Sequence, residues 1–407
     1  MSKKEENFDK FVFYFCVIDH LFLPYVWFVS IPYSLPVILL WFIRRYKYFK
    51  HIKEYSAFIV LLALMAISTF YSIVVTPGYI YKNMVYFILF TAMFLYYFMF
   101  TWYLSKYIFY GKYFIIAFLI FVVIFAMLFN IDKSLYYNIR LIWNRRSGIG
   151  IDEPILGSRY SFIWMDANNI AYMVNSLVLY LWCNEKSNIL VKISSVIALI
   201  YILISCMSNG GFITFFIGVF LYLITTIVMK RVKVKDKKIR LTPIKIILSL
   251  VAIFVLSIGI SKIPEYLETN VVKESLNRLD NNSGDSRVAI WINIVDKVNF
   301  SQYMFLGKGG VTLVDGEVIA PHNGHIYWIL SYGFISYIIF MYLIFRKRKT
   351  IKIREYIFMI PILFGFTINV LLGETKMMCI IMLFIAYASS NNYLAKVRMN
   401  ETVSQGE

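Results

Sequence analysis

A long polar segment gives way to an apolar run at the stretch Pro321-His322-Asn323-Gly324-His325-Ile326-Tyr327-Trp328-Ile329-Leu330-Ser331-Tyr332-Gly333. This change in polarity predicts that His322 lies in the first turn of a membrane helix, at the water boundary, with Pro321 at a helix start where no N–H is needed. The positive end of the helix dipole disfavours a second positive charge, which favours a neutral imidazole at His322. A neutral imidazole can accept a proton, so the stretch combines a potential base with several aromatic side chains.

The composition is typical of a membrane protein, because 60% of the 407 residues are hydrophobic, 19% are aromatic and the mean hydropathy is +0.68. The formal net charge is +18. The positive residues cluster in short loops between apolar runs, a pattern that sets membrane orientation, and no soluble basic domain indicates nucleic-acid binding. The cysteines have scattered spacings in or beside apolar segments and are expected to be core residues, without a disulfide framework or a metal site. They are Cys16, Cys183, Cys206 and Cys379.

Apolar runs of roughly 20 residues are needed to cross a hydrocarbon core. By this rule the sequence predicts an all-α polytopic membrane protein with about twelve transmembrane helices in a single integral membrane domain, residues 1–407. The predicted spans are 11–30, 31–43, 56–75, 84–104, 113–130, 162–183, 189–207, 212–229, 244–262, 324–345, 356–372 and 377–394. The first two are short and interrupted by prolines, so we expect them to be tilted or partly interfacial.

Basic residues predict the orientation of these spans. Lysines and arginines gather in 44–53, 230–240 and 346–349, which all fall on one side. The positive-inside rule makes that side cytoplasmic, together with both termini. The other side then carries two large loops, 131–161 and 263–321, among turns such as 208–211 and 373–376. Long loops on a membrane scaffold are often functional, so we expect the function to lie outside the cytoplasm.

The two large loops contain the residues best suited to an anionic ligand. Arginine offers planar paired donors and a permanent charge, which suit phosphate, although a solvated loop with incidental charges is the alternative. The arginines of the first loop are Arg140, Arg145, Arg146 and Arg159. In the second loop, 266–280 and 287–298 are predicted to be helical, and Arg287 and Trp291 share a face because they are four residues apart. The glycines of 305–310 predict a flexible turn that lets backbone approach a ligand.

The two histidines of this stretch are both candidates for the base, and they do not form a predicted metal site. His325 follows His322 by three residues and is predicted to face the same side, so either imidazole is a candidate base. The two histidines lack Cys, Asp or Glu partners at ligand spacing, and we therefore predict no metal site.

Four blocks of sequence occur in a characteristic order. The first three are Asp166-Ala167-Asn168-Asn169-Ile170-Ala171, similar to an Asp-Pro-Asn-x-x-Ala helix start, Arg287-Val288-Ala289-Ile290-Trp291, similar to Arg-x-x-x-Trp, and Leu306-Gly307-Lys308-Gly309, similar to a Gly-x-Gly turn. The fourth is His322-Asn323 followed by nine residues and Gly333. Together these blocks resemble the O-antigen ligase and polymerase superfamily, whose histidine motif the fourth block matches. The resemblance covers roughly 161–339.

The chain departs from this family in one turn and, mildly, at the last small position of the histidine motif, which is Ser336. Family ligases usually carry Ser-Arg after the span that corresponds to 189–207, whereas this chain has Ser208-Asn209-Gly210-Gly211. Arg159 or Arg146 is the expected replacement. The loss of the ligase-type arginine, with two arginine-bearing loops retained, favours a polymerase over a ligase.

The resemblance implies a GT-C-like glycosyltransferase of the bacterial inner membrane that needs no metal and no cofactor, with its active site facing the periplasm. It implies an O-antigen polymerase that transfers the growing glycan from undecaprenyl diphosphate onto a lipid-linked repeat unit. His322 would be the general base, and Arg287 would stabilise the diphosphate leaving group. The alternative is a ligase that transfers glycan to lipid A-core. A third hypothesis is a polysaccharide flippase or an ion-coupled transporter. Transporters usually place ionisable residues deep in their spans, and in this chain only Asp19, His20 and Asp166 come close to such positions.

The predicted ligands follow from the same resemblance. The expected partners are the undecaprenyl-diphosphate-linked oligosaccharide, membrane lipid and a chain-length regulator protein, without nucleic acid. Aromatic side chains offer faces for sugar rings, and these are Tyr327, Trp328, Tyr332 and Trp291. The predicted substrate-binding residues are Arg159, Arg146, Asn323, His325, Trp291, Tyr327 and Asn168.

Overall fold

The fold is described from a computed structural model of the chain. The structure describes residues 3–23, 31–49, 53–107, 109–143, 159–162, 166–184, 188–231, 287–311, 313–314, 317–318, 321–345, 353–368 and 375–386. The predicted span 244–262, the predicted helix 266–280, Arg145 and Arg146 lie outside these residues.

The described part of the chain is helical apart from one short pair of strands. Its elements are α1 (Lys3–Phe22), α2 (Leu35–Phe49), α3 (Lys53–Val75), η1 (Pro77–Tyr79), α4 (Ile80–Leu104), α5 (Gly111–Ile131), α6 (Lys133–Trp143), α7 (Ala167–Asn184), α8 (Ile189–Cys206), α9 (Asn209–Arg231), α12 (Arg287–Lys297), η3 (Phe300–Tyr303), β1 (Leu313–Val314), β2 (Glu317–Val318), α13 (Gly324–Tyr332), α14 (Phe334–Phe345), η4 (Ile353–Met359) and α15 (Ile360–Ile368). A last helix, Thr375–Ala386, follows α15. The strands pair antiparallel, with Leu313 opposite Val318.

Several helices have the length and apolarity that a bilayer requires. Five segments of the described chain are long and apolar enough to cross a membrane: Ser56–Val75, Pro77–Leu104, Gly111–Ile131, Ile189–Cys206 and Asn209–Thr226. Three shorter apolar helices are Phe334–Leu343, Tyr356–Thr367 and Thr375–Ala386. These helices support the predicted class, a helical membrane protein.

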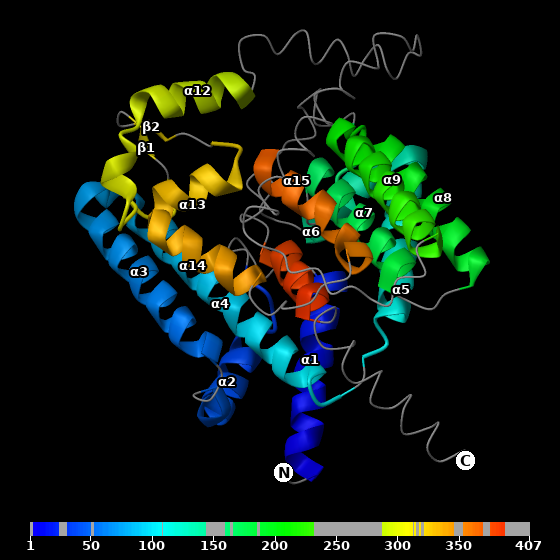
Figure 1. Ribbon diagram of the computed structural model, residues 1–407, viewed down its shortest axis with the longest axis horizontal. Coiled ribbons are helices and arrows are strands. Elements are labelled where there is room, and N and C mark those ends of the chain that lie inside the picture. The colour runs from blue at the N-terminus through cyan, green and yellow to red at the C-terminus, as the bar shows by residue number, and fades with distance from the viewer. Residues whose placement is uncertain are drawn as a thin grey trace.

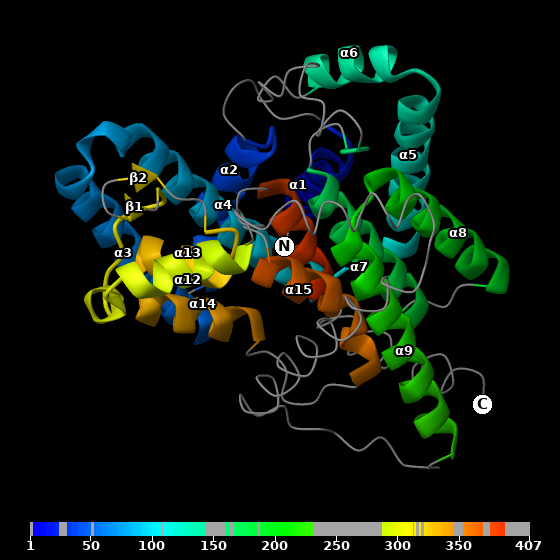
Figure 2. The ribbon, with the colours of Figure 1, turned by 90° about the horizontal axis from the view of Figure 1, so that it is seen from above.

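The helices form two groups with short helices between them (Figure 1). One group contains α3, α4, α13 and α14, and the other contains α5, α7, α8 and α9. α15 lies between α13 and α7 in both views (Figures 1 and 2). Among these five segments, Pro77–Leu104 is the most enclosed, because 61% of its apolar window is buried, against 22–39% in the other four. The less enclosed helices leave apolar side chains exposed, as contact with lipid requires.

The predicted span 324–345 is wrong in one respect, because it consists of two helices that meet at Gly333. This glycine has φ +90°, and a Cβ there would lie 2.6 Å from the carbonyl oxygen of Phe305. The break is stabilised by Ser336, whose Oγ donates to the Gly333 carbonyl (2.9 Å) and accepts from Trp328 Nε1 (3.0 Å). Gly333 and Ser336 of the histidine motif therefore shape the backbone, since glycine adopts positive φ without strain.

A helix lies inside the first of the two predicted long loops. α6 begins just after Asp132, whose carboxylate accepts from the backbone N–H of Leu135 (2.9 Å) as a helix cap. Arg140 on this helix is only 7% exposed. The alternative of a solvated loop arginine therefore does not apply to Arg140. Tyr136 beside it donates to the Ser161 carbonyl, which joins α6 to the segment that carries Arg159.

A buried ion pair joins the two ends of the described chain. Lys376 was expected in a turn outside the cytoplasm; its side chain is fully buried and its Nζ lies 2.9 Å from Asp19 Oδ1. The same ammonium donates to the carbonyls of Asp19 (2.6 Å) and Leu23 (2.7 Å). The second Asp19 oxygen accepts from the N–H (2.7 Å) and the hydroxyl (2.6 Å) of Ser34. The hydroxyls of Ser34 and Tyr96 share a hydrogen bond of 2.8 Å, so four segments meet at this pair.

The two ends of the helical body differ in their elements. α2 and the start of α1 lie at the lower end in Figure 1, whereas α12, β1 and β2 lie at the upper end. α2 carries Arg44, Arg45 and Lys47 of the basic segment predicted to be cytoplasmic. The Arg-x-x-x-Trp element of α12 therefore lies at the end opposite these basic residues.

Candidate functional site

The histidine stretch forms a sharp entry into α13. Asn323 caps this helix, because its side-chain oxygen accepts from the backbone N–H groups of His325 (2.9 Å) and Ile326 (3.1 Å). His322 was expected within the first helical turn, but it precedes the cap and has φ +46°. The cap explains the difference, because a helix begins where its first free N–H groups find an acceptor. A positive φ at a residue other than glycine is uncommon and is enriched at functional sites.

The Arg-x-x-x-Trp element is fastened to the same entry. The indole Nε1 of Trp291 on α12 donates to the carbonyl of Pro321 (2.8 Å), which is the peptide directly before His322. Arg287 is the first residue of α12, four positions before Trp291, so its backbone lies about 6 Å away along the helix axis. Two sequence blocks that are more than 30 positions apart are thereby brought together.

α12 is also anchored in a small core. Ile294 and Val298 are buried with Leu330 of α13 and Tyr303 of η3. Trp291, Ile294 and Val298 follow one another at spacings of three and four residues, so the hydrogen bond to Pro321 and the apolar packing come from the same side of α12. Both contacts hold α12 at the upper end of the molecule (Figure 1).

The Gly-x-Gly turn packs against α13, whereas the sequence predicted that it approaches a ligand. The N–H groups of Lys308 and Gly309 donate to the carbonyls of Leu330 (2.9 Å) and Ser331 (3.0 Å), which end α13. Gly307 has no room for a Cβ, because one would overlap the backbone of Ser331. Asn83 accepts from the N–H of Val311 (2.8 Å) and joins the turn to α4. The close approach that glycine permits is thus made to the protein's own backbone.

The contacts of His325 tie it to two neighbouring helices. The ring nitrogens of His325 lie 2.9 Å from the hydroxyl of Tyr337 and 3.4 Å from that of Thr367, and the ring meets Phe366 edge-on. His325 is therefore held between α13, α14 and α15. We carry His322 into the proposal as the candidate base and treat His325 as a residue that positions α13.

The aromatic residues of α13 lie in the core. Tyr327 is 6% exposed and donates from its hydroxyl to the Gly310 carbonyl (2.6 Å), and both Trp328 and Tyr332 are fully buried. All three rings contact Phe90 of α4. Their predicted sugar-stacking roles are not carried further, because neighbouring side chains cover these rings.

A second polar cluster forms where α8 ends and α7 and α9 begin. The guanidinium of Arg159 donates to the Cys206 carbonyl (2.9 Å) and to the side-chain oxygen of Asn168 (2.9 Å). The same Asn168 oxygen accepts from the hydroxyl of Ser208 (3.0 Å). Asp166 accepts from the backbone N–H of Asn168 (2.8 Å) and begins α7. Arg159 therefore lies at the turn that follows α8.

α15 contacts both His325 of the histidine stretch and the helix α7 that carries Asn168 of the Arg159 cluster. Its residues Phe366 and Thr367 contact His325, and its Phe364 lies edge-on to Tyr172, with 6.2 Å between ring centroids. Tyr172 follows Asn168 by one helical turn on α7. α15 thus lies between α13, which carries His325, and α7, which carries Asn168 (Figure 2).

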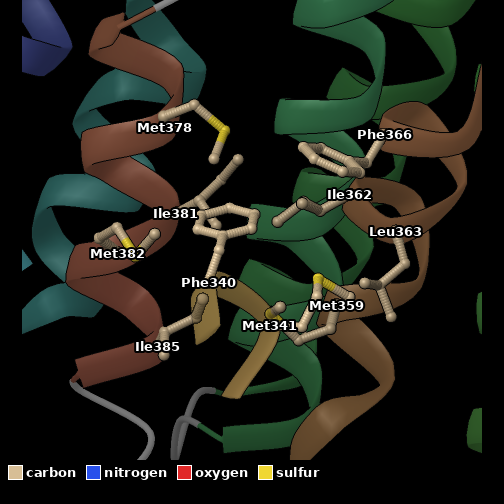
Figure 3. Close-up of a pocket in the computed structure, with 10 residues that line it drawn as sticks. All are labelled: Phe340, Met341, Met359, Ile362, Leu363, Phe366, Met378, Ile381, Met382 and Ile385. Carbon is tan, nitrogen blue, oxygen red and sulfur yellow. The ribbon is translucent and has the colours of Figure 1, made fainter. Parts of the chain in front are cut away.

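An apolar pocket lies between α14, η4, α15 and the last helix, Thr375–Ala386 (Figure 3). Its lining is entirely apolar and contains Phe340, Met341, Met359, Ile362, Leu363, Phe366, Met378, Ile381, Met382 and Ile385. Its volume is about 30 Å³. The pocket is small and apolar, and the side chains that line it supply no acid, base or charge.

Comparison with known proteins does not assign the chain to a family. No family model matches the chain, and no curated protein matches it in sequence. Within the part that the structure describes, no three His, Cys, Asp or Glu side chains come together as a metal-binding group.

Proposed function

We propose that the protein is a membrane glycosyltransferase that polymerises a lipid-linked glycan. The observation that carries this proposal is the hydrogen bond from Trp291 to the Pro321 carbonyl, because it joins the Arg-x-x-x-Trp element to the candidate base. The arrangement of about twelve spans, with a GT-C-like fold in the bacterial inner membrane, belongs to the same proposal. The large loops would then face the periplasm.

The reaction transfers a glycan from undecaprenyl diphosphate to a hydroxyl group of a lipid-linked repeat unit. The acceptor oxygen forms a bond to the anomeric carbon of the donor sugar, and the bond from that carbon to the diphosphate oxygen breaks. His322 takes the proton of the acceptor hydroxyl, while the bonding electron pair leaves with the diphosphate. A base and a stabilised leaving group are the two requirements of this step.

Two arginines support the leaving group in this proposal. Arg287 at the start of α12 supplies a permanent charge and paired donors, which match diphosphate oxygens. Arg159 supplies the second charge at the turn after α8, where its Asn168 and Cys206 contacts orient the guanidinium. Asn168 and Trp291 act by holding these elements. Asn323 fixes the helix start through its cap and places His322 ahead of it.

The acceptor distinguishes the polymerase from the alternative ligase. The departure from the Ser-Arg turn favours the polymerase, and a chain-length regulator protein is the partner that fits it. A gel of surface polysaccharide from a deletion strain tests this choice. Deletion of a polymerase should leave lipid A-core capped by a single repeat unit, whereas deletion of a ligase should leave uncapped core and stranded lipid-linked polymer.

One structural observation favours a transporter as the second candidate function. The Asp19–Lys376 pair is fully buried between helices, as ionisable groups of ion-coupled transporters often are. Purified protein in vesicles separates the two functions. Glycan elongation in detergent, without a sealed membrane, would support the glycosyltransferase, while movement of a lipid-linked glycan across vesicles without elongation would support the transporter.

A further inference from the structure

An open pocket lies between α1 and α2, at the end of the molecule opposite α12. Its volume is about 370 Å³, and its lining consists of Lys4, Glu5, Phe8, Arg44 and Arg45. Both helices lie at the lower end in Figure 1, so this pocket is separate from the histidine stretch and the Arg159 cluster. The proposed glycan transfer gives it no role.

The pocket has more positive charge than its own carboxylates compensate. Arg45 is buried and paired, with Nη2 2.9 Å from Asp9 and Nη1 3.5 Å from Glu5. Arg44 instead lies over the ring of Phe8, 4.7 Å from its centroid. Within the described residues, neither Arg44 nor Lys4 has a carboxylate partner. Two cations at the pocket are therefore free to meet an anion.

Exposed apolar side chains continue from these cations along both helices. On α1, the spacing of Lys4, Phe8, Phe11 and Phe15 places them on one helical face. Phe11 is 58% exposed and stacks on Phe15, with 5.8 Å between ring centroids. On α2, Leu40 is 45% exposed and lies one turn before Arg44. The surface is therefore cationic at the helix ends and apolar toward the middle of the body.

We propose that this pocket binds the headgroup of an anionic phospholipid. The phosphate lies between Lys4 and Arg44, and the acyl chains follow Phe11, Phe15 and Leu40. Basic pockets between membrane helices on the cytoplasmic side are suited to acidic headgroups, and the guanidinium of Arg44 can bind two phosphate oxygens at once. Inorganic phosphate could use the same cations but would gain nothing from the apolar stripe, so the stripe favours a lipid.

Lipid retention by the full-length protein tests the proposal. The protein is purified in neutral detergent and incubated with phosphatidylglycerol, with phosphatidylcholine or with inorganic phosphate, and bound molecules are counted by native mass spectrometry. We expect saturable binding of phosphatidylglycerol, with affinity reduced about fivefold by Arg44→Gln and about 25-fold by Lys4→Gln and Arg44→Gln together, since each cation contributes on the order of fivefold near an anionic surface. Arg44→Lys should bind with an affinity between those of the unchanged protein and Arg44→Gln, because it keeps the charge but loses the paired donors.

The control is Lys82→Gln, which removes a cation stacked on Tyr79 in the first turn of α4, far from the pocket. It should leave phosphatidylglycerol binding unchanged. Equal binding by Lys4→Gln/Arg44→Gln and by the unchanged protein would overturn the proposal, as would equal binding of phosphatidylcholine. Inorganic phosphate that competes at concentrations similar to those of the lipid would reassign the pocket to a free anion. Far-UV circular dichroism of each variant confirms that the helices are intact, and Arg44→Lys provides a charged substitute if Arg44→Gln does not fold.

Discussion

Replacing Lys376 with methionine should destabilise the protein strongly, although Lys376 lies outside the candidate site. Its Nζ donates three hydrogen bonds, to Asp19 Oδ1 and to the carbonyls of Asp19 and Leu23. Methionine fills the space of the lysine stem but removes the charge, so the Asp19 carboxylate remains buried and, among the described residues, keeps the Ser34 donors alone. Removal of one member of a buried ion pair typically costs about 3–5 kcal/mol.

A double-mutant cycle isolates the pair from the packing around it. Asp19→Asn should also cost about 3–5 kcal/mol, because the ammonium of Lys376 is then left uncompensated. The double variant buries no charge, and the asparagine oxygen can still accept from Ser34. We therefore expect the double variant to be more stable than the sum of the single changes predicts, with a coupling free energy of about 3 kcal/mol.

Unfolding in mixed detergent micelles, by titration with a denaturing detergent, measures this coupling. The matched control is the Glu6–Lys10 pair on α1, which has a similar contact of 2.6 Å but is exposed. An exposed pair is screened by water, so this control should show little or no coupling. Additive effects of Asp19→Asn and Lys376→Met would refute the buried pair as a linked unit.

The remaining predictions concern the candidate site and the turn behind it. His322→Ala should lower glycan elongation by about a hundredfold or more without loss of substrate binding, since general-base catalysis typically supplies that factor, and His325→Ala should be milder; turnover by purified His322→Ala at the unchanged rate would exclude the base assignment. Arg287→Lys should lose most of the activity because the paired donors are gone, whereas full activity of Arg287→Ala would remove this residue from the mechanism. Gly307→Ala should lower the free energy of unfolding by about 1–3 kcal/mol, because its Cβ overlaps the backbone of α13, while Gly78→Ala has open space and serves as the control in the same titration.

The class of helical membrane protein could be predicted because it depends on hydrophobicity alone. Runs such as 56–75 and 189–206 satisfy the length and apolarity of a span without any knowledge of their neighbours. The break at Gly333 could not be predicted in the same way. It depends on the Phe305 carbonyl and on the bond from Trp328 to Ser336, contacts that apolar composition does not encode. The run 324–345 is continuous in hydropathy but interrupted in backbone geometry.

The sequence predicted the order of the Arg-x-x-x-Trp element and the histidine stretch along the chain, but not that they are in contact. Hydrophobicity and spacing do not determine the distance between Trp291 and Pro321, because a loop can place its helices in many positions. The same limit applied to His325. Its spacing suggested a shared face with His322, but the cap at Asn323 lets the chain turn between the two, so the three-residue helical rule does not apply.

Polar contacts over long sequence separations were the least predictable feature of this chain. Asp19 and Lys376 are 357 positions apart, and each lies in or beside an apolar run. A charge in that position is ordinarily expected at the water boundary, because burial without a partner is unfavourable. Only the fold supplies the partner. Arg159 illustrates the same point, since it was one of four loop arginines until its contacts with Asn168 and Cys206 placed it at the turn after α8. In both cases the charge was visible in the sequence, and its role depended on which distant backbone and side-chain acceptors the packing of helices brought within reach.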